Sequence, residues 1–165
     1  MNVTDLLLPE VDQELASTRR LLERIPTQSL AWKPHPKSFS MGQLASHMVS
    51  VLKWTYEIME RPDFDVDTIN RDEMTKVAAT PAELLSWFDA NAAAARALLA
   101  KDDGDYLAPW TLRKGDHVMF TMPRYRCLRN FVVNHLIHHR AQLTVYLREN
   151  DVLVPGMYGP TADEG

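Results

Sequence analysis

The segment that most constrains the fold of this chain is FVVNHLIHHRAQLTVYLREN, residues 131–150. Its apolar side chains recur every three or four residues, which predicts one long amphipathic helix. His135 and His139 stand four residues apart, so they lie on the same face of that helix. The residues within roughly 40° of His135 on a helical wheel are Leu128, Phe131, Gln142 and Tyr146. We therefore expect both imidazoles to project from an inward-facing stripe.

Two histidines on one inward face indicate a metal site. Neutral imidazole is a common ligand for zinc, nickel, copper and iron, and an H-x-x-x-H pair presents two nitrogens that can converge on one ion. A second helical stretch, MGQLASHMVSVLKWTYEIM at residues 41–59, carries His47 on its apolar face. Burying three imidazoles is costly unless each finds a partner, and one shared divalent ion supplies it. We predict that His47, His135 and His139 bind a metal.

Two alternatives to this ligand set stay open at this stage. The histidines could instead be core residues that bond to Gln142, Tyr146 and one another without a metal. His138 competes with His139 as a ligand, because it also lies one turn from His135. Its direction differs from that of His135 by about 60°, against about 40° for His139, so we expect His138 to be a packing residue.

Four amphipathic helices are predicted, and they account for most of the chain. They span residues 4–24, 40–59, 80–100 and 124–150. Ser40 and Gln43 form a capping box at the start of the second helix, and Thr80, Pro81 and Glu83 supply the cap, first and third positions of the next. The fold class expected is all-α, a four-helix bundle with long connections.

Three connections separate these helices, at residues 25–39, 61–79 and 101–123. A tail, residues 151–165, follows the last helix. Around Lys114, Gly115 and Asp116, within residues 104–123, the pattern predicts a short hairpin or an extended flap. His117 beside that turn is expected to be exposed, although a flap histidine could reach the metal. His35 lies between two prolines and is expected to be solvated.

Composition limits the classes of function. A chain of 165 residues with 45% apolar residues suits one domain over residues 1–165 with a sizeable core. The formal charge of -4 and the lack of a basic run argue against a nucleic-acid partner. No basic leader or long apolar segment is visible, so we expect no membrane association and a cytoplasmic location. The single cysteine, Cys127, excludes an internal disulfide.

The outer side of the last helix is unusually apolar. Val133 and Ile137 lie about 160° and 200° from His135 on the helical wheel, away from the predicted inward stripe. Such residues are either covered by the flap and linkers or buried against another subunit. We hypothesise a homodimer that uses this face.

The chain resembles the DinB-like (YfiT/DinB) family of small metal-binding proteins. The resemblance rests on WKPHPKSFSMGQLASH at 32–47, NHLIHHRAQLTVYLRENDV at 134–152 and VPGMYGPTADE at 154–164. It implies an up-down-down-up four-helix bundle, a dimer, and a divalent metal, nickel or zinc. By motif position the ligands would be His47, His135 and His139. The family often has glycine where Ala141 stands, and a helix tolerates that methyl group.

The resemblance also implies a function. Relatives in the wider superfamily attach low-molecular-weight thiols to electrophiles, so the chain is expected to be a metal-dependent thiol S-transferase in stress response or detoxification. A thiol cosubstrate and a small-molecule substrate follow from that expectation, and no residue is assigned to the chemical step. The alternatives are a metal-dependent hydrolase and a non-catalytic, stress-induced metal-binding dimer.

Overall fold

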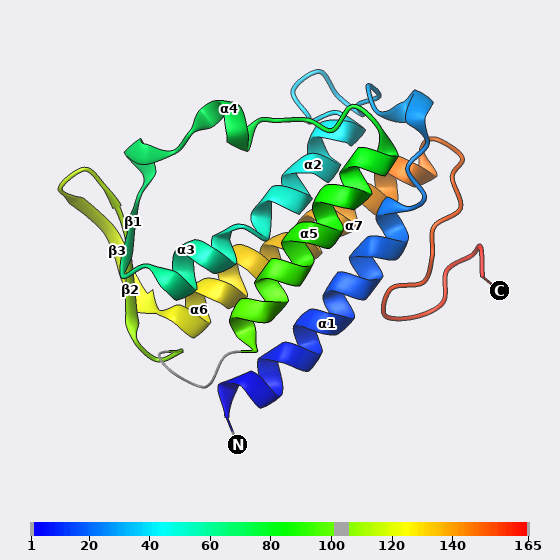
Figure 1. The fold of residues 1–165 in the computed structure, drawn as a ribbon. Helices are drawn as coiled ribbons and strands as arrows, with labels where there is room; N and C mark the ends of the chain where they lie inside the picture. The colour runs from blue at the N-terminus through cyan, green and yellow to red at the C-terminus, as the bar shows by residue number, and fades with distance from the viewer. Residues whose placement is uncertain (1, 101–105, 165) are drawn as a thin grey trace.

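The structure, a computed structural model, describes residues 2–100 and 106–164 (Figure 1). Its long helical segments are α1 (Val3–Leu22), α2 with α3 (Met41–Val51 and Trp54–Glu60), α5 (Pro81–Leu99), and α6, η3 and α7 (Arg124–Leu128, Arg129–Val133 and Asn134–Arg148). Helices α1 and α7 run in one direction, whereas α2 and α5 run in the other (Figure 1). Both α1 and α2 pack against α5 and α7. Within the described residues, none of the helices is long and apolar enough to cross a membrane.

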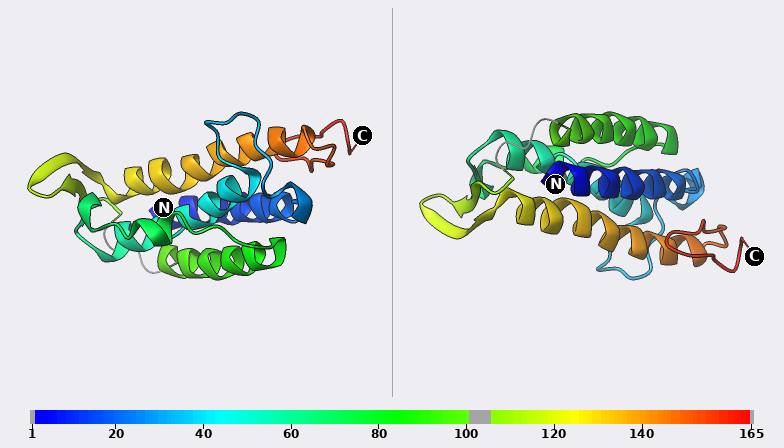
Figure 2. Two further views of the ribbon diagram at one scale, coloured as in Figure 1. Left: turned by 90° about the horizontal axis from the view of Figure 1, so that it is seen from above. Right: turned by 90° about the horizontal axis from the view of Figure 1, so that it is seen from below.

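Shorter elements occupy the connections between these helices. They are η1 (Thr27–Ser29), η2 (Val66–Thr68) and α4 (Arg71–Met74). The described part of the tail after α7 contains no helix, as predicted. Figure 2 shows the tail at one end of the helical array and a β-hairpin at the other.

The predicted starts of α2 and α5 are confirmed. Ser40 Oγ accepts a hydrogen bond from the Gln43 amide at 3.2 Å, and Gln43 Oε1 accepts one from the Ser40 amide at 2.8 Å. Before α5, Thr80 Oγ1 accepts a hydrogen bond from the Glu83 amide at 3.1 Å. Pro81 follows in the first helical turn, where a backbone N–H would have no partner within the helix, so proline loses no hydrogen bond there. These caps satisfy amides that would otherwise lack partners, so they set where both helices begin.

The predicted all-α four-helix bundle is wrong, because the chain also forms a three-stranded mixed sheet. Its strands are β1 (Asp63–Asp65), β2 (Pro109–Lys114) and β3 (His117–Pro123), in that order. β1 pairs parallel to β2, and β2 pairs antiparallel to β3. The predicted hairpin is confirmed as β2 and β3, and its turn holds Gly115 at a φ of 54°, which glycine adopts without steric cost. β1 lies in a connection for which no strand was predicted.

Long-range polar contacts explain why β1 joins the hairpin. Arg113 Nε donates to Asp63 Oδ1 at 3.0 Å, and Arg113 Nη1 donates to Asp65 Oδ2 at 2.6 Å. Trp110 of β2 is fully buried and donates from Nε1 to the Glu57 carbonyl of α3 at 3.0 Å, which attaches the sheet to the helices. Periodicity within one segment cannot reveal these contacts, because their partners lie far apart in the chain.

Val133 and Ile137 do not form a free surface. Val133 is buried, and Ile137 packs against the same core. Helix α7 packs against α1 as well as α2, and Arg140, which lies on the same side of α7 as these residues, contacts Glu14 of α1. The face assigned to a second subunit is therefore covered within the chain. The homodimer stays a prediction, and the face that carries Val133 and Ile137 no longer supports it.

A buried ion pair joins α1 to α7. Arg140 Nη2 lies 2.5 Å from Glu14 Oε2, and the two side chains are only 2% and 7% exposed. Arg140 Nη1 also donates to the Glu14 carbonyl at 3.0 Å. The Tyr158 hydroxyl in the tail accepts from Arg140 Nη2 at 2.6 Å and donates to Glu14 Oε2 at 2.8 Å. Because the pair is dry, removing one partner leaves an uncompensated buried charge.

We predict that Glu14→Ala lowers the free energy of unfolding by about 3–5 kcal/mol, because Arg140 stays buried without its carboxylate. Urea unfolding followed by circular dichroism measures the change. The matched control is Glu10→Ala, also on α1, which removes an ion pair to Arg129 whose side chains are 38% and 30% exposed. An exposed pair contributes roughly 0–1 kcal/mol, so equal losses in the two variants would contradict the prediction.

Candidate metal centre

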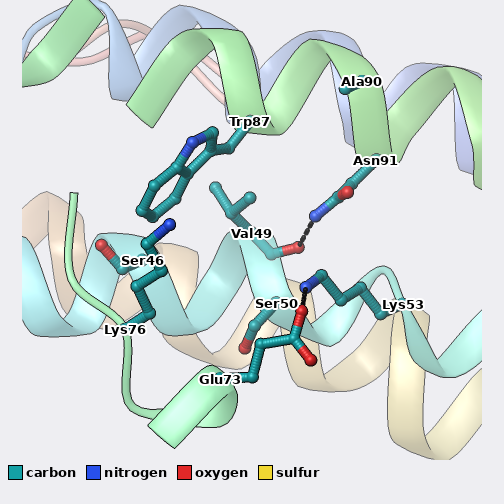
Figure 3. Close-up of a pocket in the computed structure, with 9 residues that line it drawn as sticks. All are labelled: Ser46, Val49, Ser50, Lys53, Glu73, Lys76, Trp87, Ala90 and Asn91. Atoms are coloured by element: carbon teal, nitrogen blue, oxygen red, sulfur yellow. Dashed lines mark hydrogen bonds and ion pairs between the residues drawn. The ribbon is translucent and has the colours of Figure 1, made fainter. Parts of the chain in front are cut away.

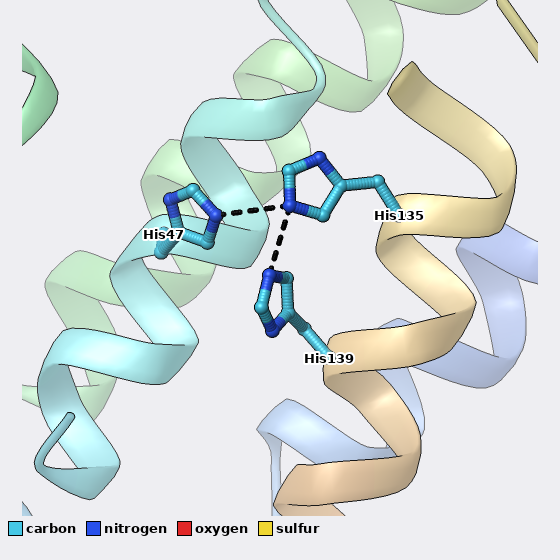
Figure 4. A group of neighbouring side chains, drawn as sticks. All are labelled: His47, His135 and His139. Atoms are coloured by element: carbon cyan, nitrogen blue, oxygen red, sulfur yellow. Dashed lines mark hydrogen bonds between the residues drawn. The ribbon is translucent and has the colours of Figure 1, made fainter. Parts of the chain in front are cut away.

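His47 of α2 and His135 and His139 of α7 point toward one another where the two helices pack (Figure 4). Nε2 of His135 lies 3.2 Å from Nε2 of His47 and 2.9 Å from Nε2 of His139. One nitrogen from each ring lies within 4.8 Å of the others, so the group could hold a metal ion. The structure thus brings together the three histidines named from the sequence, and their binding of a metal stays a prediction.

The three rings lie at the rim of the helix interface and are half-buried. The fully buried side of α7 carries Leu136, Leu143 and Leu147, and Gln142 beside the histidines is exposed. The stripe predicted to face inward is therefore a boundary between core and solvent. A small molecule can approach nitrogen atoms at such a boundary, whereas the centre of the core would exclude it.

Burial keeps the imidazoles neutral. It is the largest cause that lowers the pKa of His47 to about 4, and repulsion from His139 and His135 adds to it. Burial is also the largest cause that lowers the pKa of His135 and of His139. Neutral rings retain a free lone pair, which is the state that a metal ligand requires.

A hydrogen bond on α7 assigns the tautomer of His139. His139 Nδ1 lies 2.7 Å from Gln142 Oε1, which is an acceptor, so Nδ1 carries the proton. His139 therefore turns an unprotonated Nε2 toward the cluster. Burial lowers the pKa of His135 more strongly than the Phe131 backbone raises it.

The resulting donor set fits a divalent cation. Nε2 of His135 and Nε2 of His139 lie 2.9 Å apart, a distance at which two lone pairs would repel unless a proton or a metal ion lies beside both. Two nitrogens that each bind zinc at about 2.0–2.1 Å, at a tetrahedral angle, lie about 3.3–3.4 Å apart. The spacings of 3.2 and 2.9 Å in the cluster are slightly shorter than this, so a small movement of the rings would admit an ion.

Aromatic residues near His47 were missed in the sequence. The Phe39 ring, in the loop before α2, lies 5.8 Å from the His47 ring, centroid to centroid. Tyr146 packs edge-on against Trp32 at 5.4 Å, and its hydroxyl donates to the Phe39 carbonyl at 3.3 Å, so it does not satisfy a histidine. The loop thus places an apolar ring beside the nitrogen cluster. In the sequence, the only sign of this contact was the presence of Trp32 and Phe39 in the proline-rich segment before the capping box.

The remaining histidines lie outside the cluster. His138 is exposed, and its ring lies 4.9 Å from that of His139 without joining the group of three. His117 is exposed at the start of β3 and is likewise not part of the group. His35 is exposed in its loop, where its Nδ1 accepts from the Lys37 amide at 3.2 Å. The structure therefore favours neither His138 of α7 nor His117 of the hairpin as a metal ligand.

Together, the fold and the cluster define a helical protein with a small sheet and a candidate centre for one divalent ion. The sequence profile of the DinB family matches residues 1–165, so the chain belongs to the DinB family. It is 26% identical to the protein YrdA of Bacillus subtilis strain 168, across 97% of this chain and 90% of YrdA. The family resemblance inferred from the motifs is confirmed.

Two solved structures share the fold. A DinB-like protein from Bacillus cereus ATCC 10987 has a TM-score of 0.69 and 23% identity, and the match covers 89% of this chain and 92% of that one. A putative DinB family member from Exiguobacterium sibiricum 255-15 has a TM-score of 0.69 and 20% identity, with 100% and 99% covered. At these identities the likeness establishes the fold alone.

The lowered pKa of His47 predicts that the metal-free protein loses stability in acid. Unfolded histidine takes up a proton below about pH 6.5, whereas folded His47 does so only near its pKa of about 4. Between these values the unfolded state binds more protons, so the free energy of unfolding falls as the pH is lowered through this range.

Urea unfolding in EDTA at about pH 7 and about pH 5 measures this decrease. The decrease should be smaller in His47→Asn than in the wild type and unchanged in His117→Asn, which alters an exposed histidine. The same decrease in His47→Asn and the wild type would show that His47 does not cause it.

Proposed function

We propose that the protein is a metal-dependent enzyme that joins a low-molecular-weight thiol to a small electrophile, in stress response or detoxification. The observation that carries the proposal is the convergence of three neutral imidazoles at a half-buried surface. Three protein ligands leave a position for an outside molecule, as in catalytic zinc sites. Nickel and zinc are the ions we expect, because both suit imidazole donors.

The chain's own residues prepare the site for this chemistry. Gln142 orients His139 through its Nδ1, so Nε2 of His139 stays available. Phe39 supplies an apolar surface beside His47 for an organic substrate. A divalent ion held by the histidines would supply the Lewis acidity that lowers the pKa of a thiol near it. In the reaction, the thiol proton passes to water, sulfur bonds to the electrophilic carbon, and the leaving group departs with its bonding electrons.

The composition of the cluster favours a thiol over water as the nucleophile. Among the described residues, no aspartate or glutamate joins the three histidines. A free thiol ionises near about 8.5 and bulk water near about 15.7, and a bound divalent ion would lower both values, so the thiol needs the smaller change. Thiol transfer therefore depends less on a side chain that acts as a general base, and for this reason we prefer it to hydrolysis.

We predict that the untagged protein binds about one zinc or nickel ion per chain, as a three-histidine site should. Elemental mass spectrometry after desalting measures the content. His47→Ala and His139→Ala should lose the ion, because each leaves only two donors. His138→Ala is the matched control, since it removes an exposed imidazole next to His139 and should keep the ion. Retention in both ligand variants would refute the site.

We predict that the metal-loaded protein forms a thioether from monochlorobimane and a low-molecular-weight thiol. The assay compares bacillithiol, mycothiol and glutathione, detects the product by mass spectrometry, and uses His139→Ala as the inactive variant and His138→Ala as the active control. Ester hydrolysis without thioether formation would replace the proposal with a metal-dependent hydrolase. A loaded protein active in neither assay would instead support a non-catalytic metal-binding role.

A further inference from the structure

A hollow lies between α2 and α5, where the connection that contains α4 crosses them (Figure 3). Its volume is about 230 Å³, the space of about seven or eight water molecules at roughly 30 Å³ each. Ser50, which lines it, donates to the His47 carbonyl at 2.8 Å, whereas the His47 ring turns toward α7. The hollow is therefore separate from the histidine cluster, on another side of α2.

The charged side chains of this hollow leave one positive charge uncompensated. Lys53 Nζ lies 3.4 Å from Glu73 Oε1, with side chains 55% and 67% exposed, so this ion pair is long and weak. Lys76 Nζ lies 4.7 Å above the centroid of the Trp87 ring. In the part of the chain that the structure describes, Lys76 forms no ion pair with a carboxylate. Two ammonium groups thus face one carboxylate, and an anion is favoured.

A buried hydroxyl in the same hollow has an unused proton. Ser46 is only 4% exposed, and its Oγ accepts a hydrogen bond from the Ala78 amide at 3.0 Å. Over residues 2–100 and 106–164, no group accepts the Ser46 hydroxyl proton. Because Ser46 lines the hollow, an acceptor that enters there can take this proton in place of water. Figure 3 shows the Ser46 hydroxyl and the Lys76 ammonium at the same end of the hollow, near Trp87.

We propose that this hollow binds a small organic carboxylate. Its carboxylate accepts hydrogen bonds from the Lys76 ammonium and the Ser46 hydroxyl, which are the two unmatched donors. Its carbon skeleton packs against Val49 and Trp87, which with Ala90 form the apolar part of the wall. A net charge of one and an apolar wall suit a monocarboxylate better than phosphate, which carries more charge and no apolar part.

The test uses benzoate as the probe and follows the full-length protein by ¹⁵N NMR. The reporters are the Ala78 backbone amide and the Asn91 side-chain amide, which donates to the Val49 carbonyl at 3.1 Å. Benzoate should shift both signals in a saturable way, and neutral benzamide should not. The same titration of His139→Ala in EDTA excludes binding through a metal, because that variant lacks a ligand of the other site.

Variants test whether Lys76 and Ser46, and not the overall charge of the protein, determine the affinity for benzoate. Lys76→Met should weaken benzoate binding up to about fivefold, the value of an exposed ion pair, and Ser46→Ala should weaken it by roughly two- to tenfold through the lost hydrogen bond. Glu73→Gln should tighten it, because a competing carboxylate is gone. Lys114→Met, which removes an exposed lysine on the hairpin, is the control.

Three outcomes would overturn the proposal: unshifted reporters in both the wild type and Glu73→Gln, equal affinity in Lys76→Met, Ser46→Ala and the wild type, or binding of inorganic phosphate as tight as that of benzoate. The last outcome would identify a general anion site instead of a carboxylate site.

Discussion

The packing of α2 against α7 is the constraint on which the chemistry of this protein depends. It brings His47 to within 3.2 Å of His135, although the two are 88 residues apart in the chain. The capping box at Ser40 and Gln43 sets the phase of α2, and the ion pair of Arg140 with Glu14 holds α7 to α1. Because two helices in a packed core carry the nitrogens, their arrangement is prepared before any ligand binds, which reduces the cost of binding.

Each of these two helices separates environments of different charge. His139 and Arg140 are neighbours in sequence, but about 100° of helical rotation directs one toward α2 and the other toward α1. Half-burial keeps the first neutral, whereas the Glu14 carboxylate neutralises the second and the Tyr158 hydroxyl bonds to both partners. Helix α2 acts similarly, since His47 faces α7 while Ser46 and Ser50 line the hollow toward α5. Helix α2 can thus carry the proposed carboxylate site on one face and the neutral histidine on another.

Much of the helical framework and of the candidate site could be predicted from local signals. The caps at Ser40 and Thr80, the hairpin turn at Gly115 and the helical face on which each of the three histidines lies all depend on residues within a few positions of one another, or on the phase of one helix. Three short motifs indicated the resemblance to the DinB family, which the match of the family profile to residues 1–165 confirmed. The errors arose where a segment's partner was remote: Asp63 and Asp65 joined Arg113 in a sheet, and Val133 was buried against neighbours within its own chain.

The sequence by itself determined which residues could form helices, where α2 and α5 begin, and that two histidines share one face of α7. Only the tertiary structure decided that β1 completes a sheet, that the histidines lie at a solvent-accessible rim, and that Phe39 stands beside His47. The physical reason is one of range. Caps, turns and helical phase follow from steric and hydrogen-bonding preferences within one or two turns of chain, whereas burial depends on which distant surfaces meet.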